Sequence, residues 1–291
     1  MTTDVWQRLQ LTSKVDLEKV RYAVGQPSDR VVLFAFFASL FCFHYGAEVL
    51  ALASGGLFGS HSRAASSAEI IGFAAIVVVL KNFGTDRILR QWDFVAIIAA
   101  AIILIHPWYA TRTLALTALG LLFVARSDKR LSSLGQLCIG LAWIDGWGQL
   151  ALTFAEQWLL PIETAIGYLV ALPFGPFSIA GNVILGQNGH ELMIAEACSA
   201  FRNTIVTTFI WLSLVKIQGL DFRPWHFRAL AMGIAVVVLL NSVRIALMAH
   251  SYDSYVFWHT GGGLIIIKSA MWVIVLGLFY LGLRRAESET V

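Results

Sequence analysis

The chain has few charged residues, and this shortage limits the classes of protein to which it can belong. Only 13% of its 291 residues are Asp, Glu, Lys or Arg, whereas 58% are hydrophobic and the mean hydropathy is +0.72. An ordinary soluble domain has about twice that share of charged residues. The composition therefore excludes an ordinary soluble protein and predicts an integral membrane protein.

Cysteine is also scarce, with Cys42, Cys138 and Cys198 as the only thiols. Cys42 and Cys138 lie in the middle of apolar runs, where a thiol usually fills space as a small apolar group, so a disulfide framework is excluded. The Cys-x-x-Cys and His-Glu-x-x-His spacings of metal sites are missing, as is any fixed-period repeat. We therefore expect no metal or other cofactor, and Cys198 is the one thiol near water.

Long apolar runs make up most of the chain. A helix of about 20 apolar residues spans the roughly 30 Å hydrocarbon core of a bilayer. The runs therefore predict an all-α, polytopic transmembrane helical bundle of about eight spans. The spans are expected at residues 31–53, 68–81, 92–106, 111–126, 132–154, 197–217, 228–249 and 264–283.

Residues 155–196 form the longest segment between two predicted spans. Within it, the apolar stretch 165–172 is too short to cross a bilayer. We expect this stretch to be an interfacial or re-entrant external helix before the site cysteine, with a simple connecting loop as the alternative.

Lys and Arg are distributed unevenly between the runs. Most of the 21 lie before the first run, after the second, fourth and sixth, and at the end of the last. Since cytoplasmic loops are rich in these residues, both termini are expected in the cytoplasm and the protein in the cell (inner) membrane. The basic residues occupy five separate segments, so we expect binding to the lipid bilayer and no binding to nucleic acid.

These assignments predict one membrane domain with short tails. The N-terminal tail is 1–30, in which no cleaved signal peptide is expected. The transmembrane domain is 31–283, with its catalytic part at about 190–270, and the C-terminal tail is 284–291.

Cys198, Arg244 and His259 lie beside the last three apolar runs. In the predicted topology, each of the three residues falls at the extracytoplasmic end of its run or in the short loop beside it. They can meet if these helices pack side by side, which short connections favour.

Each of these residues has a use in acyl transfer. A thiol at a helix N-terminus feels the positive end of the helix dipole, and Arg202, four residues after Cys198, is expected on the same helical face, so both favour the thiolate. The planar guanidinium of Arg244 suits a developing oxyanion. His259 can supply or remove a proton near neutral pH, which completes a Cys-His-Arg set.

Supporting roles are expected for three further residues. Asn241 lies three residues before Arg244 on the same helical face and is expected to orient it. Glu196 is expected to compensate a helix dipole, with a tie to Arg202 as an additional role. Asp145 is an intramembrane acid and a functional candidate, for which pairing with an arginine and lining a wet pocket are both open.

Simpler explanations exist for each residue taken alone. Cys198 can be a small structural residue, Arg244 a cation that snorkels to the interface, and His259 a loop histidine. His190 and Glu191, just before Cys198, compete with His259 for the role of base.

Three motifs follow one another in the last third of the chain: Glu196-Ala-Cys-Ser-Ala-Phe-Arg202, Asn241-Ser-Val-Arg244 and Phe257-Trp-His259-Thr-Gly-Gly. In these motifs the chain resembles the exosortase/archaeosortase family, membrane-embedded cysteine transpeptidase-like enzymes that process C-terminal sorting signals on exported proteins. The resemblance implies a catalytic set that falls here on Cys198, Arg244 and His259. It also implies membrane-anchored protein substrates that end in a short motif, a transmembrane helix and a basic tail.

The residue chemistry and the resemblance together predict a cysteine protease or transpeptidase that acts at the extracytoplasmic face through a thioester acyl-enzyme. Ala200 and Phe201 depart from the family's usual glycine and aliphatic residue after Cys-Ser; the nucleophile is unaffected, and the recognised motif stays open. The alternative function is a non-catalytic membrane transporter, flippase or assembly factor for exopolysaccharide or surface proteins. Such a protein would tolerate replacement of Cys198.

Overall fold

The computed structural model describes residues 28–53, 67–83, 88–104, 109–186 and 189–288. Most of these residues are helical, which confirms the predicted helical fold. A small three-stranded sheet is also present, so the prediction of an all-α protein was wrong in this part.

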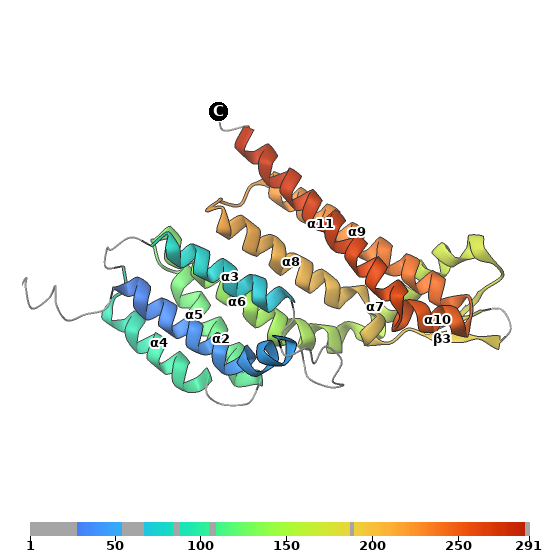
Figure 1. Cartoon of the computed structure of the whole chain (residues 1–291), viewed down its shortest axis with the longest axis horizontal. Coiled ribbons are helices and arrows are strands. Elements are labelled where there is room, and N and C mark those ends of the chain that lie inside the picture. Colours follow the sequence, from blue (N-terminus) through green and yellow to red (C-terminus); the bar gives the residue numbers. More distant parts are fainter. Residues whose placement is uncertain (1–27, 54–66, 84–87, 105–108, 187–188, 289–291) are drawn as a thin grey trace, which may run out of the picture.

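Helices of the N-terminal half pack around one core, because their sequences are apolar on most faces and can bury residues against several neighbours. Figure 1 shows them side by side in blue to green. The helices are α2 (Asp29–Ala53), α3 (Ser67–Lys81), α4 (Gln91–Leu104), α5 (Tyr109–Val124) and α6 (Lys129–Ala142). Buried residues of this core include Phe37, Ile76, Ile97, Phe123 and Leu134.

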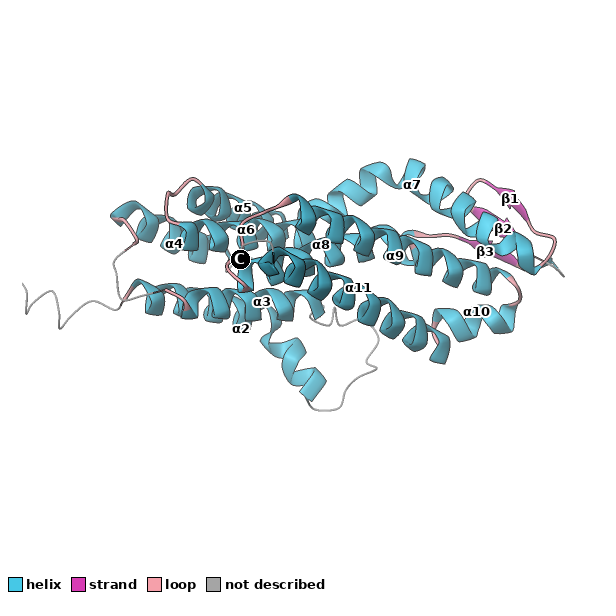
Figure 2. Ribbon diagram, turned by 90° about the horizontal axis from the view of Figure 1, so that it is seen from above, coloured by secondary structure: helices cyan, strands magenta, loops and turns pink. Residues whose placement is uncertain are grey.

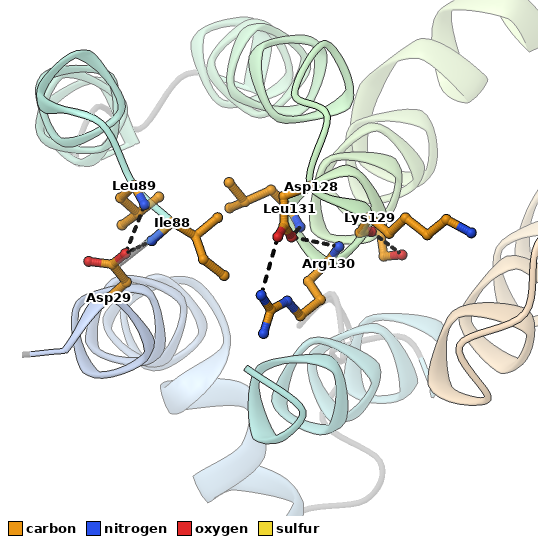
Figure 3. Close-up of polar contacts among 8 residues, drawn as sticks. Asp29, Ile88, Leu89, Asp128, Lys129, Arg130 and Leu131 are labelled. Carbon is orange, nitrogen blue, oxygen red and sulfur yellow. Dashed lines mark hydrogen bonds and ion pairs between the residues drawn. The ribbon is translucent and has the colours of Figure 1, made fainter. Parts of the chain in front are cut away.

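Acidic side chains hold one end of this bundle (Figure 3). The carboxylate of Asp29, at the start of α2, accepts hydrogen bonds from the backbone N–H groups of Ile88 and, at 2.8 Å, Leu89. Asp128 caps α6 by accepting two backbone N–H groups of its first turn, at 2.9 and 3.1 Å. Asp29 therefore ties the start of α2 to the chain just before α4, and Asp128 satisfies backbone donors at the start of α6.

A π-helical turn (Trp143–Trp147) joins α6 directly to α7 (Gly148–Ala171). Helical structure is therefore continuous for 46 residues from Lys129 to Phe174. At 1.5 Å per residue this run is about 69 Å long, more than twice the thickness of a hydrocarbon core. The predicted span 132–154 is thus only part of a longer helix.

The stretch 165–172 is the end of α7 and its last turn, so the predicted separate interfacial or re-entrant helix is not present. Pro161 lies inside α7. A proline removes one backbone donor but does not by itself stop a helix that packs along its length. The stretch was expected to stand alone because it is too short to cross a bilayer by itself.

The small sheet follows α7 and leads to Cys198. Its strands pair antiparallel in the order β1-β2-β3, with Ile184 of the central strand opposite Leu192. Both of these side chains are buried, and they pack in one cluster with Ile245 and Met248. The strands are β1 (Ser178–Ala180), β2 (Val183–Leu185) and β3 (Glu191–Met193).

Helix α9 is the centre of the C-terminal half, since it packs against α7, α8, α10 and α11. Figure 2 shows α9 between α7 and α11, with the sheet and α10 at the same end. The helices are α8 (Ala200–Ile217), α9 (Pro224–Ala249), α10 (Tyr252–His259) and α11 (Gly262–Ser288). We call the end of this half where α8 begins and α9 ends the site end.

Three helical runs in the described part of the chain are long and apolar enough to cross a membrane: Lys129–Phe174, Pro224–Ala249 and Gly262–Arg284. Three other apolar helices are shorter, at Ile70–Lys81, Gln91–Leu104 and Ala110–Val124. The structure therefore supports a membrane protein, and it does not establish the eight spans of the sequence prediction.

Close contact between α7 and α9 predicts a stability effect. A methyl group on Gly167 would lie 2.6 Å from the Cγ2 atom of Ile245, whereas one on Gly277 of α11 would meet nothing within 4 Å. Gly167→Ala should lower the free energy of unfolding by about 1–3 kcal/mol through overpacking. Gly277→Ala should be neutral or slightly stabilising, because alanine favours helix. Unfolding of both purified variants in detergent tests this, and equal stability would contradict the predicted contact.

Candidate functional site

Cys198 lies between the sheet and α8, at the site end. It is the last residue of a short 3-10 turn, and the extended Ser199 (φ −67°, ψ 139°) separates it from the first residue of α8. The side chain of Cys198 is only 5% exposed and packs in a cluster with Ile184, Ile245 and Met248. Of the three thiols, it is the one held between the sheet and α9.

Asn241 and Arg244 stand one turn apart on α9 and contact the same atom of Cys198. Asn241 Nδ2 donates to the Cys198 carbonyl oxygen at 2.8 Å, and Arg244 Nη2 donates to it at 3.4 Å. Both side chains are buried, with 4% and 7% exposed. The spacing of three residues therefore places them on one face, as the sequence indicated.

The guanidinium of Arg244 keeps unused hydrogen-bonding capacity. Its Nε atom is buried and has no hydrogen-bond partner within the described residues. Its positive charge acts on His259. Arg244 therefore contacts the backbone of Cys198, disfavours the charged form of His259 and retains a donor for another group.

His259 ends α10, and its ring stacks on that of Tyr255 with a centroid distance of 4.8 Å and an interplanar angle of 15°. Burial lowers the pKa of His259 below its ordinary value, and the positive charge of Arg244 lowers it further. Since an ordinary histidine has a pKa of about 6.5, His259 is mainly neutral at pH 7. A neutral imidazole can accept a proton.

His190, the competing base, is held elsewhere. Its Nε2 lies 3.1 Å from the carbonyl oxygen of Met248, and its ring is 6.3 Å from that of Tyr255. Glu191 is exposed on β3. The structure thus places Tyr255 between His190 and His259.

Arg202 and Glu196 do not take the positions expected from their spacing. Arg202 is exposed in the first turn of α8. It does not share a helical face with Cys198, because the extended Ser199 interrupts the helix between them. Glu196 is exposed in the 3-10 turn, and no ion pair joins it to Arg202 in the described structure.

Asp145 belongs to a different part of the molecule. It lies in the π-helical turn after α6, and its Oδ2 is 3.0 Å from Nη2 of Arg112 on α5. The carboxylate side chain is only 3% exposed. Of the two roles left open for Asp145, pairing with an arginine is the one found.

Sequence reasoning missed Glu163, which holds the chain immediately after Cys198. Its two carboxylate oxygens accept a hydrogen bond from the Ser199 hydroxyl at 2.9 Å and from the backbone N–H of Ala200 at 3.1 Å. The available signal was an isolated acid in the apolar stretch before the sheet. Tyr255, the stacking partner of His259, was also missed.

No family model, curated protein or solved structure matches the chain. No group of three or more His, Cys, Asp or Glu residues in the described ranges could hold a metal ion. The side chains gathered at the site end are a buried thiol, a guanidinium with a spare donor and a neutral imidazole. These are the groups needed for nucleophilic attack, oxyanion stabilisation and proton transfer.

The electrostatic coupling between Arg244 and His259 predicts a measurable shift. Arg244→Gln removes a positive charge that disfavours the imidazolium, so the pKa of His259 should rise, whereas Arg244→Lys should leave it nearly unchanged. The pH dependence of His259 modification by diethylpyrocarbonate, followed by mass spectrometry, measures the midpoint. The exposed His250 is the internal control. An unchanged His259 midpoint in Arg244→Gln would show that the two groups are not coupled.

Proposed function

We propose that the chain is a membrane-embedded cysteine protease or transpeptidase, similar to exosortases and archaeosortases, that cleaves C-terminal sorting signals of exported proteins. The observation that carries this proposal is the contact of Asn241 and Arg244 with the backbone of Cys198. It supports a nucleophile held in place beside a cation. These two hydrogen bonds satisfy the buried carbonyl oxygen of Cys198 and hold the residue that carries the thiol against α9.

In the proposed reaction, neutral His259 takes the proton of the Cys198 thiol, and the sulfur attacks the scissile carbonyl carbon of the substrate. The new oxyanion faces Arg244, whose buried Nε has a free donor. The C–N bond then breaks, and His259 returns the proton to the leaving amine. The product is a thioester on Cys198, which water or an amine acceptor resolves.

Positioning in this proposal comes from the groups around the thiol. Asn241 fixes the carbonyl of Cys198, and Glu163 fixes the next two residues of the chain. Tyr255 holds the plane of the His259 ring. Arranging the reacting groups before the substrate arrives reduces the entropy cost of reaching the transition state.

We further propose that the site end faces outward from the cell membrane and that both termini are cytoplasmic. The charge pattern supports this, because Lys129, Lys216, Arg223 and Arg228 gather where α6 begins, α8 ends and α9 begins. Substrates would be membrane-anchored proteins whose C-terminal helix lies against the bundle and whose recognition motif reaches the site end.

Labelling of single cysteines tests this orientation. In a background without the native thiols, a cysteine replacing the exposed Asp253 of α10 should react with an impermeant maleimide in intact cells. A cysteine replacing Asp221, whose side chain is 75% exposed, should react only after permeabilisation. The reverse pattern would place the site in the cytoplasm and exclude exported substrates.

Substitutions of the three reacting residues test the chemistry. Cys198→Ala should abolish cleavage of a substrate tail, while the protein stays folded. Arg244→Lys keeps the charge but loses the planar fork, so the rate should fall about 10²-fold or more. His259→Ala should be similarly severe. The measurement is the gel mobility of a tagged substrate in cells, at matched enzyme expression.

His250→Ala is the matched control for the histidine substitution, because His250 caps the exposed end of α9 and should be dispensable. His190→Ala should also be tolerated. Full processing by Cys198→Ala would exclude the enzyme and favour a transporter, flippase or assembly factor. An active His259→Ala beside an inactive His190→Ala would assign the base to His190.

A further inference from the structure

Lys268 of α11 is a charged residue that the proposed reaction does not use. Its position along the bundle axis follows from the contacts of two glycines, which fix how α9 and α11 are aligned. A methyl group on Gly233 of α9 would lie 2.8 Å from the ring of Phe279, and one on Gly282 of α11 would lie 2.6 Å from Ala229. The two helices therefore run antiparallel in a fixed register. Continued toward the site end, this register places Lys268 level with the last turns of α9.

Arg244 occupies those turns of α9, and Arg202 lies in the first turn of α8 beside it. Side chains on a helix tilt toward its N-terminus. Arg202 and Lys268 both lie near the N-terminal ends of their helices, so both lean toward the site end. The charges of Arg244 and Arg202 both act on Lys268. The register and these charge interactions therefore bring three permanent cations to the site end.

No acid in the described structure compensates these three cations. Arg202 and Lys268 take part in no hydrogen bond or ion pair within the described ranges, and Arg244 bonds only the Cys198 carbonyl oxygen. The nearby carboxylate of Glu163 already accepts donors from Ser199 and Ala200. This differs from the N-terminal half, where buried Asp145 and Asp93 each pair with an arginine.

Like charges repel one another, and a bound anion would relieve that repulsion most at the buried Arg244, beside which Arg202 and Lys268 are exposed. The buried Nε of Arg244, with Arg244 7% exposed and no partner on this atom, is a donor already desolvated for such an anion. Guanidinium forks bind two oxygens of a phosphate at once, and an ammonium adds a third contact.

We propose that Arg202, Arg244 and Lys268 form a binding site for a phosphate group at the membrane surface where α11 begins. The surroundings favour a phospholipid headgroup as the source of the phosphate, because Ile265 and Ile266, just before Lys268, are 67% and 59% exposed on an apolar helix. Such a face contacts acyl chains and brings headgroups to the end of α11. This site goes beyond the proposed cleavage reaction and stands whether or not Cys198 is a nucleophile. Because both proposals use the same donor of Arg244, phosphate and substrate would compete for it.

Lipid retention by the full chain tests the site. The purified protein is titrated in detergent with phosphatidylglycerol and, separately, with diacylglycerol of the same acyl chains, and the retained lipid is counted by native mass spectrometry. Phosphatidylglycerol should bind and diacylglycerol should not. Lys268→Gln should weaken binding roughly fivefold, as expected for one lysine at a membrane surface. Lys268→Arg should retain most of the affinity.

Lys129→Gln is the matched control, because Lys129 is 83% exposed at the other end of the bundle and should have no effect. Arg202→Gln tests the site through an exposed residue if Lys268→Gln does not fold. Inorganic phosphate is the second probe. If it raises the unfolding temperature of the wild type but not of Lys268→Gln, while phosphatidylglycerol is not retained, the site binds free phosphate.

Equal retention of phosphatidylglycerol and diacylglycerol, together with no effect of inorganic phosphate, would overturn the proposal. Unchanged binding in both Lys268→Gln and Arg202→Gln would overturn it as well. The Cys198→Ala variant separates this proposal from the cleavage reaction. It should bind the phosphate probe as the wild type does, even though it cannot cleave a substrate.

Discussion

The carbonyl oxygen of Cys198 is the point on which the C-terminal half depends. A backbone carbonyl buried among apolar helices is costly unless it accepts a hydrogen bond. Here it accepts two, from Asn241 and Arg244, and both donors come from α9. Since α9 also contacts α7, α10 and α11, this one acceptor ties the start of α8 to the central helix. Glu163 completes the arrangement from α7 by accepting donors just after Cys198.

Charge is handled differently in the two halves of the molecule. In the N-terminal half, buried acids such as Asp145 and Asp93 neutralise arginines, so these pairs serve packing and orientation. At the site end, Arg244 is bound by a neutral carbonyl and keeps its full charge. Holding an arginine at the midplane of a bilayer costs about 2.5 kcal/mol or more of free energy. Retaining such a charge without an acid is understandable if a substrate or ligand supplies the negative partner.

Sequence patterns predicted the apolar helices and the shared face of Asn241 and Arg244, because both follow from helical periodicity. They could not predict strands of three residues, which are too short to show alternation, or the continuity of α7 past Pro161, which depends on tertiary packing. Glu163 was missed for the same reason. Its role exists only because α7 passes beside the start of α8.

The extended backbone of Ser199 changes how the thiol can be activated. A helix dipole acts through free N–H groups of the first turn. In α8 the Ser199 hydroxyl accepts the N–H of Phe201, and Glu163 accepts that of Ala200. The first N–H groups of α8 are therefore already hydrogen-bonded, and little of the positive end of the helix dipole is left to act on Cys198. In the proposed reaction, activation of Cys198 therefore rests on Arg244, which contacts its carbonyl oxygen, and on the neutral His259 as proton acceptor.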